Sequence, residues 1–229
     1  MEASKEKEQP PSLQNGPLDD NDVALILWSS GTTGLSKGIQ HTVKYMRKNF
    51  HRMNDRLSGI KWNTLTTTCY FHVGGFITPL QIIGEAKGFI FNHGPDIDGP
   101  QSVESLYREI DMFKPLYLLC GSHHIVQLSQ QGPKDRSLDL SYVLMIAPAG
   151  STVPPTIYRD LKKNFKNLAA VVNGYGMTEC VGFRGVAFSF DATYLGGVAP
   201  GCIVKIVDPE TGEICGPLEV IIFYNYSIN

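Results

Sequence analysis

The apolar run VALILW (residues 23–28) passes directly into SSGTTGLSKG (residues 29–38), and this junction is the most informative stretch of the sequence. Asp and Asn residues precede the run, and small polar residues follow it. A continuous apolar run with such borders is typical of a strand that is buried on both faces. We therefore expect a strand over residues 23–28 that ends in a glycine-rich loop.

The loop at residues 29–38 combines glycines and hydroxyl side chains with one lysine, Lys37. Backbone N–H groups and side chains of these types converge readily on phosphate oxygens. The loop differs from a Walker A motif, because Gly38 stands where that motif has a serine or threonine after its lysine. The alternative is a surface turn rich in small residues, but the hydroxyls and the lysine together favour phosphate binding.

Beyond this loop, apolar runs that suit strands alternate with segments of helical periodicity. Strands are predicted at residues 65–70, 88–91, 116–120, 142–147 and 169–172, and helices at residues 42–57, 76–83, 103–113 and 155–165. This alternation predicts an α/β fold with a parallel sheet. Residues 202–207 alternate instead and lead into the turn-forming segment 208–213, which predicts a short antiparallel β segment.

Composition divides the chain into four parts. Residues 1–20 are charged, contain proline and have few aliphatic side chains, so we expect a flexible leader. An α/β core is expected over residues 21–194, and the beginning of a β subdomain over residues 195–220. Residues 221–229 form an apolar, aromatic tail without a turn signal.

Charge and cysteine usage exclude several classes of protein. A net charge of -2 provides no cationic field for a nucleic-acid backbone or an anionic membrane, so we expect neither partner. The 5 cysteines are widely spaced without a CxxC pair, which predicts reduced thiols and an intracellular location. No apolar run reaches the ~18 residues of a membrane span, and the first residues lack the apolar core of a signal peptide.

A second motif, NGYGMTE (residues 173–179), again follows a short apolar run. Gly174 and Gly176 let the backbone approach a flat ring, and Tyr175 between them offers a stacking face. The hydroxyl of Thr178 suits a phosphate, and the carboxylate of Glu179 suits a magnesium ion. Ligands of α/β sheets bind where strands end, so the two motifs together predict one nucleotide site.

The two motifs closely resemble those of the acyl-adenylate-forming superfamily, which includes acyl-CoA synthetases, coumarate-CoA ligases, beetle luciferases and the adenylation domains of peptide synthetases. The resemblance runs over residues 22–220 and implies part of that family's parallel-sheet α/β N-terminal domain, followed by a short antiparallel β segment. It implies that ATP phosphates are contacted by Ser29, Ser30, Gly31, Thr32, Thr33, Gly34 and Lys37. It also implies that Glu179 holds Mg²⁺, while the nucleotide is bound by Asn173, Gly174, Tyr175, Gly176, Met177 and Thr178.

The stretch YFHVGG (residues 70–75) resembles an aromatic-histidine turn of the same family. By that match, His72 lies near the substrate carboxylate. A lone histidine is often a packed core residue, but the glycines and the preceding strand favour a place in the site. The resemblance thus implies catalytic roles for His72, Thr178 and Glu179.

The stretch APAGS (residues 147–151) resembles a turn that lines the adenine and substrate sites in this family. This match implies nucleotide contacts from Gly150 and Ser151. The neighbouring histidines His123 and His124 lack such a context, and we interpret them as structural or surface residues.

The resemblance implies that a carboxylic acid is activated with ATP to an acyl-adenylate, with Mg²⁺ as cofactor, and is then transferred to coenzyme A. Aromatic residues near the motifs favour a fatty or aromatic acid; they are Phe71, Phe76 and Phe183. Two alternatives stay open. One is a catalytically inactive nucleotide-binding or regulatory fragment, and the other is a luciferase-like monooxygenase that shares these motifs.

The chain lacks matches to the family's long region before the phosphate loop and to its ribose-binding aspartate, hinge and small C-terminal domain. We therefore expect a sequence truncated at both ends, with weak nucleotide binding and little turnover. Exposed sheet edges would favour self-association. Related ligases often end in a peroxisomal tripeptide, whereas this chain ends in Ser227-Ile228-Asn229, so cytoplasm and peroxisome both stay open.

Overall fold

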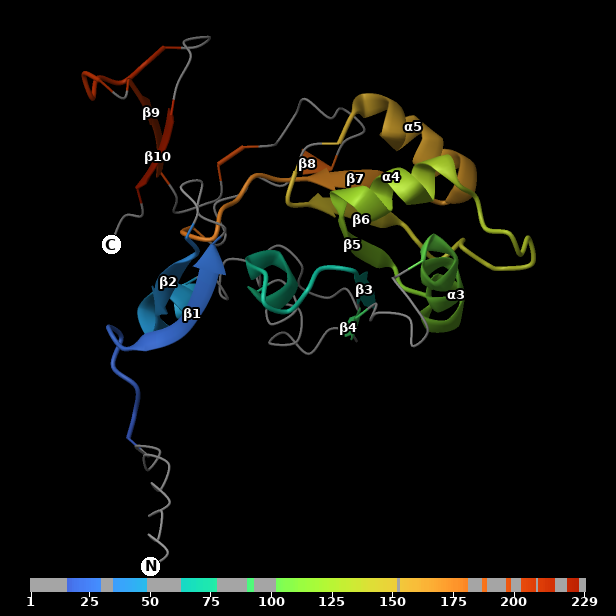
Figure 1. The fold of residues 1–229 in the computed structure, drawn as a ribbon, viewed down its shortest axis with the longest axis horizontal. Coiled ribbons are helices and arrows are strands. Elements are labelled where there is room, and N and C mark those ends of the chain that lie inside the picture. Colours follow the sequence, from blue (N-terminus) through green and yellow to red (C-terminus); the bar gives the residue numbers. More distant parts are fainter. Residues whose placement is uncertain are drawn as a thin grey trace, which may run out of the picture.

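The computed structural model describes residues 16–29, 35–48, 63–77, 90–92, 102–151, 153–180, 187–188, 197–198, 203–208, 210–216 and 222–226. Its centre is a 6-stranded sheet in the order β4-β3-β5-β6-β7-β8 (Figure 1). The strands are β3 (Thr64–Thr66), β4 (Ile90–Asn92), β5 (Tyr117–Gly121), β6 (Met145–Ala149), β7 (Ala170–Asn173) and β8 (Ala187–Phe188). Neighbours from β4 to β7 pair in parallel, and β8 pairs antiparallel with β7. The predicted α/β fold with a parallel sheet is confirmed.

Helices α3 (Val103–Phe113), α4 (Ser122–Gln130) and α5 (Pro155–Asn164) cover one face of this sheet (Figure 1). Helix α3 begins where the side chain of Ser102 accepts a hydrogen bond from the Ser105 N–H. It ends at Lys114, whose left-handed backbone (φ 49°) closes the last turn. Helix α5 begins with a proline, whose missing N–H leaves no helical bond unmade in a first turn.

The predicted and observed residue ranges of α3 are identical. For β5, β6, β7 and α5, the predicted ranges differ from the observed ones by a few residues. Strand β3 is shorter than predicted. Helix α4 is missing from the prediction, because it follows β5 directly and no side chain caps its first turn. Of the helices predicted at residues 42–57 and 76–83, the structure describes helical residues 43–48 and 73–77. Thr42 lies in a strand instead, and residues 49–57, 78–83 and residues 1–15 of the predicted leader lie outside the described residues.

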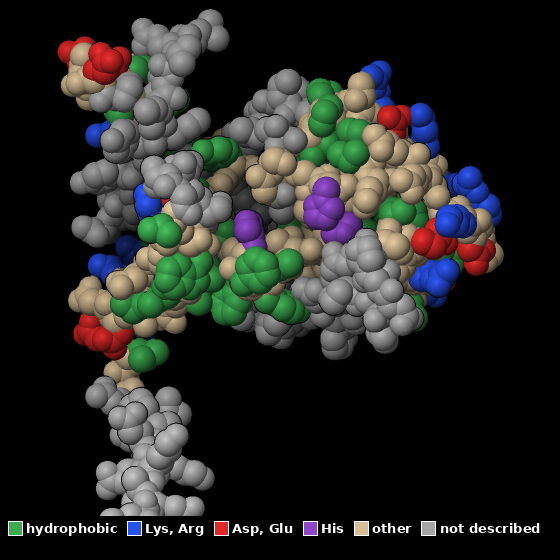
Figure 2. Space-filling view, viewed as in Figure 1, with side chains coloured by type: hydrophobic (Ala, Val, Ile, Leu, Met, Phe, Trp, Pro, Cys, Tyr) green, Lys and Arg blue, Asp and Glu red, His purple; other side chains and the backbone are tan. Residues whose placement is uncertain are grey.

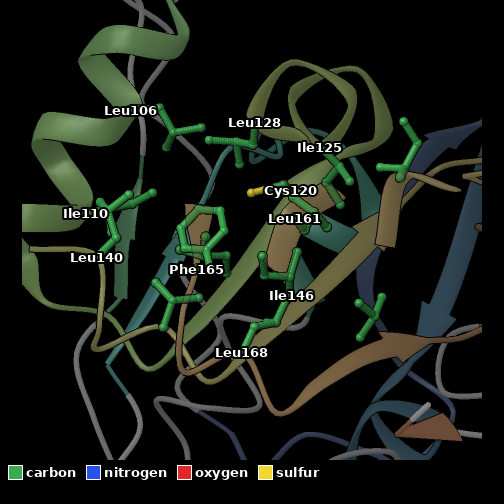
Figure 3. Packing of buried hydrophobic residues seen from close by; sticks show 14 of the residues in the cluster. Leu106, Ile110, Cys120, Ile125, Leu128, Leu140, Ile146, Leu161, Phe165 and Leu168 are labelled. Atoms are coloured by element: carbon green, nitrogen blue, oxygen red, sulfur yellow. The ribbon is translucent and has the colours of Figure 1, made fainter. Parts of the chain in front are cut away.

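The main hydrophobic core lies between the helices and the sheet (Figure 3). Leu106 of α3, Leu128 of α4 and Leu161 of α5 are fully buried in it, as is Leu118 of β5. Successive residues of a strand point to opposite faces, so Leu119 is buried in a smaller cluster on the other side of the sheet. Both faces of β5 are therefore buried, as expected for a central parallel strand.

The glycine-rich loop is carried by a separate antiparallel hairpin of β1 (Val23–Ser29) and β2 (Lys37–Thr42). The prediction that residues 23–28 are buried on both faces is wrong. Ile26 is 49% exposed and Trp28 is 67% exposed, whereas Leu27 is buried. A two-stranded hairpin packs with one face only, so alternate residues of an apolar run remain in solvent.

This hairpin packs against the helical residues 43–48 and 73–77. Leu27 of β1, Met46 and Ile77 form a small buried cluster that is separate from the main core. The hairpin is thus tied directly to the segment that follows the YFHVGG motif.

Strands β9 (Ile203–Val207) and β10 (Ile222–Tyr226) form a two-stranded antiparallel sheet of their own. This confirms the antiparallel β segment predicted near the end of the chain. The turn at residues 208–213 brings the chain back only to a single bridge between Val207 and Ile214, whereas β10 pairs with β9 along its whole length. None of the described helices is long and apolar enough to cross a membrane.

Candidate active site

The side chains predicted to bind nucleotide and acid follow neighbouring strands of the central sheet. His72 comes after β3, Gly150 and Ser151 come directly after β6, and the segment 173–179 begins at the end of β7. Because these strands are parallel, their carboxyl ends lie at one edge of the sheet, where ligands bind in folds of this kind. The structure thus brings three of the four predicted motifs to the same edge.

Hydrogen bonds join the ends of β3, β5 and β6. The Gly121 N–H, at the end of β5, donates to the hydroxyl of Thr67 just after β3 at 3.0 Å. The Ser122 hydroxyl, at the start of α4, donates to the Ser151 carbonyl after β6 at 2.9 Å. These bonds fix the spacing between the turn that carries His72 and the turn that carries Ser151.

His72 is held in a tight hydrogen-bonded turn. Its N–H donates to the Cys69 carbonyl at 2.9 Å, and its own carbonyl accepts from the Gly75 N–H at 3.0 Å. The Gly74 N–H donates to Nδ1 of the imidazole at 3.1 Å. Because Nδ1 accepts, the neutral ring carries its proton on Nε2. The exposed imidazole therefore offers Nε2–H as a donor to a ligand such as a carboxylate.

The turn after β6 depends on Gly150. Its backbone has φ +91°, a conformation that side-chain-bearing residues rarely adopt, and apart from its chain neighbours no heavy atom of the described residues lies within 4 Å of where its Cβ would be. The neighbouring Ser151 is exposed. The backbone of Gly150 and Ser151, the two predicted nucleotide contacts, is therefore accessible to a flat ligand.

The segment 173–179 leaves the sheet at a buried residue and ends in an exposed turn. Asn173 is 3% exposed, whereas Tyr175 is 36% exposed between two exposed glycines. Met177 and Cys180 form an antiparallel bridge, and the Cys180 N–H donates to the Met177 carbonyl at 3.1 Å. Thr178 and Glu179 consequently occupy the two central positions of a turn. Thr178 is half-buried, and Glu179 is exposed.

The predicted phosphate loop connects the two strands of the hairpin. Ser29 at the end of β1 lies opposite Lys37 at the start of β2, so both predicted phosphate ligands stand at the same end of the hairpin. Lys37 is exposed. The other predicted phosphate contacts, Ser30, Gly31, Thr32, Thr33 and Gly34, lie outside the described residues.

His41 of β2 joins this hairpin to the turn at Thr178 and Glu179, a link that the sequence prediction missed. Its imidazole is 2% exposed and stacks on Tyr45 with ring centroids 5.4 Å apart. Burial lowers the pKa of His41, and two smaller influences oppose this: the Thr178 backbone acts as a hydrogen-bond partner and the Glu179 carboxylate is nearby. The hairpin and the second motif are therefore neighbours in space.

Lowering the pH below neutrality is expected to destabilise the protein through His41. Its folded pKa lies below 6.5, so the unfolded chain takes up a proton that the folded chain does not. Stability then falls as the pH drops below the unfolded value, by at most about 1.4 kcal/mol per pH unit for one proton, until the folded pKa is passed. Urea denaturation at a series of pH values measures this slope.

The matched variants are His41→Phe, which keeps a ring beside Tyr45, and His123→Phe at an exposed position. The first is expected to flatten the pH profile, and the second to leave it unchanged. Equal profiles for His41→Phe and the parent chain would contradict the assignment to His41.

The charged side chains on the face shown in Figure 2 lie mainly around its rim, and histidine side chains lie nearer its middle. Among the residues that the structure describes, no group of three or more His, Cys, Asp or Glu side chains is placed to hold a metal ion.

Comparison with known proteins finds a matching family model and related enzymes. The family model described as AMP-binding enzyme matches residues 1–220. Luciferin 4-monooxygenase of Photuris pensylvanica is 30% identical over 217 residues, which cover 87% of this chain and 36% of that protein. 4-Coumarate–CoA ligase-like 2 of Arabidopsis thaliana is 25% identical, with 94% of this chain and 38% of that protein covered. The chain thus spans 36% and 38% of the lengths of these two relatives.

Solved structures share the fold. The luciferase-like enzyme from the nonluminescent Zophobas morio mealworm superposes with a TM-score of 0.70 at 23% identity, covering 91% of this chain and 48% of that one. O-succinylbenzoate coenzyme A synthetase from Bacillus subtilis, in complex with ATP and magnesium ion, superposes with a TM-score of 0.66 at 20% identity, covering 88% and 40%. The expected α/β architecture is therefore the architecture of these enzymes.

Proposed function

Because this chain belongs to the AMP-binding enzyme family, we propose that it is the nucleotide-binding part of an enzyme that activates a carboxylic acid with ATP and passes the acyl group to coenzyme A. The observation that carries the proposal is that the Thr178 backbone and the Glu179 carboxylate lie near enough to His41 to raise its pKa against the larger effect of burial. It places the hairpin that bears Ser29 and Lys37 beside the turn of the second motif. Phosphate ligands from one motif and nucleotide ligands from the other then serve a single molecule.

In this reaction, a carboxylate oxygen of the acid attacks the α-phosphorus of ATP. The bond between that phosphorus and the bridging oxygen breaks, and pyrophosphate leaves with the electron pair. The products are acyl-AMP and pyrophosphate. The thiolate of coenzyme A then attacks the acyl carbon, and AMP leaves.

The hairpin supplies the groups for the leaving phosphates. The ammonium of Lys37 offsets the negative charge of these phosphates, and the hydroxyl of Ser29 donates a hydrogen bond that orients them. The loop residues 30–34 contribute further phosphate contacts. The Thr178 hydroxyl, at the corner of its turn, donates to the α-phosphate. Glu179 would hold Mg²⁺, and the ion would supply positive charge opposite the phosphates.

The remaining groups orient adenine and acid. The ring of Tyr175 stacks on adenine, and the flanking segment from Asn173 to Met177, with Gly150 and Ser151, lines its edge. The Nε2–H of His72 donates to the carboxylate of the acid. Phe71 beside it is 78% exposed, which supports an acid with a fatty or aromatic body.

Calorimetry of the chain with Mg-ATP tests the proposal. Replacing Lys37 and Thr178 by alanine removes a charged and a hydroxyl ligand, so ATP affinity is expected to fall at least about tenfold. The matched control replaces Lys44 and Thr156, which are exposed elsewhere, and is expected to bind like the parent. A chain that is folded by circular dichroism but does not bind ATP would refute the site.

Pyrophosphate release in the presence of fatty or aromatic acids then distinguishes an active enzyme from a module that only binds nucleotide. Release supports an enzyme, whereas ATP binding without release supports the alternative of a nucleotide-binding or regulatory module. Comparison of acids of different length and aromaticity defines the substrate class.

A second candidate is luciferase-like oxygenation of an acyl-adenylate, which the 30% identity to luciferin 4-monooxygenase favours. Both reactions begin with adenylation, so the ATP measurement applies to both. Formation of an acyl-CoA thioester supports the ligase, and oxygen consumption with light emission supports the monooxygenase.

A further inference from the structure

Tyr158 of α5 lies outside every motif of the sequence but contacts the nucleotide segment directly. Its hydroxyl donates to the side-chain oxygen of Asn173 at 2.7 Å. Both residues are almost fully buried, with Tyr158 2% exposed and Asn173 3% exposed. Both side chains are shielded from water, so removal of the Tyr158 hydroxyl takes away a hydrogen bond that solvent does not replace.

This contact fixes the direction of the Asn173 amide. Burial raises the pKa of Tyr158, so the phenol stays protonated and acts as the donor. The amide oxygen must therefore face the phenol, and the amide nitrogen, with its two N–H donors, must face the opposite way. The orientation of Asn173 is thus set by a residue of α5.

The hydrogen bond from Tyr158 matters because of where Asn173 lies in the chain. Asn173 is the last residue of β7 and the first of the segment 173–179. The next residues include Gly174 and Gly176, which have no side chains to hold the backbone in place. The course of the segment therefore depends on how its two ends are held. Asn173 holds one end, and the turn beside His41 holds the other.

Helix α5, which carries Tyr158, is fixed in place by its packing in the core. Ile157 and Leu161 flank Tyr158 in the sequence and are buried in the main core (Figure 3 shows Leu161). Ile157 is 8% exposed and Leu161 is 0% exposed. The phenol therefore has little freedom to follow the segment if the segment moves.

We propose that Tyr158 is a positioning residue for the nucleotide, which acts by holding Asn173 and thereby the start of the segment that carries Tyr175 and Thr178. This inference rests on the proposed function. Tyr158 touches neither the reacting atoms nor the nucleotide, and its effect on binding passes entirely through Asn173.

A second buried tyrosine supplies the control. Tyr107 of α3 is 0% exposed, and its hydroxyl oxygen lies 2.9 and 2.6 Å from the carbonyl oxygens of Leu128 and Gln131, which share its single proton as acceptors. The same hydroxyl accepts a hydrogen bond from the side-chain amide of Asn164 at 3.2 Å. It lies in the same core as Tyr158, but its bonds go to the C-terminal ends of α4 and α5 and not to the segment 173–179. The variants Tyr158→Phe and Tyr107→Phe therefore each remove one buried hydroxyl and leave the ring, but only the first removes a bond to the nucleotide segment.

The test compares Mg-ATP affinity and urea midpoints of the parent and both variants. Both variants are expected to lower the midpoint, whereas only Tyr158→Phe is expected to weaken ATP binding, by about fivefold. In an Asn173→Ala background, Tyr158→Phe is expected to have little further effect, because the bond is already absent. Equal ATP affinities for the two phenylalanine variants, with the parent binding ATP, would overturn the inference and leave the proposed function intact.

Amide hydrogen exchange over residues 174–179 gives a readout that needs no ligand. Exchange there is expected to be faster in Tyr158→Phe than in Tyr107→Phe or the parent. If the folded parent fails to bind ATP, the proposed function fails, and the positioning inference fails with it. Equal exchange in the two variants would overturn the inference by itself.

Discussion

An alanine at position 75 is expected to destabilise the protein by about 3 kcal/mol and to displace the turn that carries His72. The added Cβ would overlap the Cys69 carbonyl oxygen and lie 2.6 Å from the Thr68 carbonyl oxygen. Both are backbone atoms of the same turn, so no flexible side chain can move aside to relieve the overlap. The His72 N–H bond to Cys69 would have to break or lengthen. Urea denaturation measures the loss of stability.

The neighbouring Gly74 provides the matched control. A Cβ at this position would meet Nδ1 of His72 at 3.4 Å, at the edge of ordinary van der Waals contact. Gly74→Ala is therefore expected to change stability by less than about 1 kcal/mol, and its backbone N–H still donates to His72. Equal stabilities of the two alanine variants would show that the turn adapts and that Gly75 is not required.

Phe165→Ala is expected to lower the free energy of unfolding by about 3–5 kcal/mol. The ring lies in the main core (Figure 3) and is 0% exposed at the C-terminal end of α5. It packs on Tyr107, with ring centroids 6.3 Å apart. Its removal leaves a cavity between the helices and the sheet. A domain is typically stable by only about 5–15 kcal/mol, so much of the native population is expected to be lost on mild heating.

The control for this variant is Met112→Ala on α3, where the side chain is 69% exposed. Its effect is expected to stay within about 0.5 kcal/mol, because no packed group is removed. Urea midpoints with equal slopes compare the two variants. A loss of less than about 1 kcal/mol for Phe165→Ala would mean that the core collapses around the missing ring.

Elements with a strong local signal were predictable from the sequence. Helix α3 has regular helical periodicity, a serine cap and a stop before Pro115, and its bounds are as predicted. Helix α4 has neither a capping side chain nor a separating turn, so its start was not visible. The burial of β1 was predicted wrongly, because an apolar run fits a central strand and one strand of a hairpin equally well.

The candidate site shows the same division. The sequence places His72, Gly150, Ser151 and the segment 173–179 after apolar strands, and strand order along a parallel sheet then brings them to one edge, whereas their roles in the site stay predictions. His41 and Tyr158 were missed. Neither residue lies in a recognisable motif, and the residue that each one meets is far away in the sequence.

The motifs along the chain predict the family by resemblance, the alternation of strands and helices, and the residues expected to bear the chemistry. The folded chain alone decides that His41 meets the turn at Thr178 and that Tyr158 holds Asn173. The reason is physical. Periodicity records which face of an element is apolar, but a single buried polar contact between distant segments depends on how whole elements pack, and packing is a property of the assembled core.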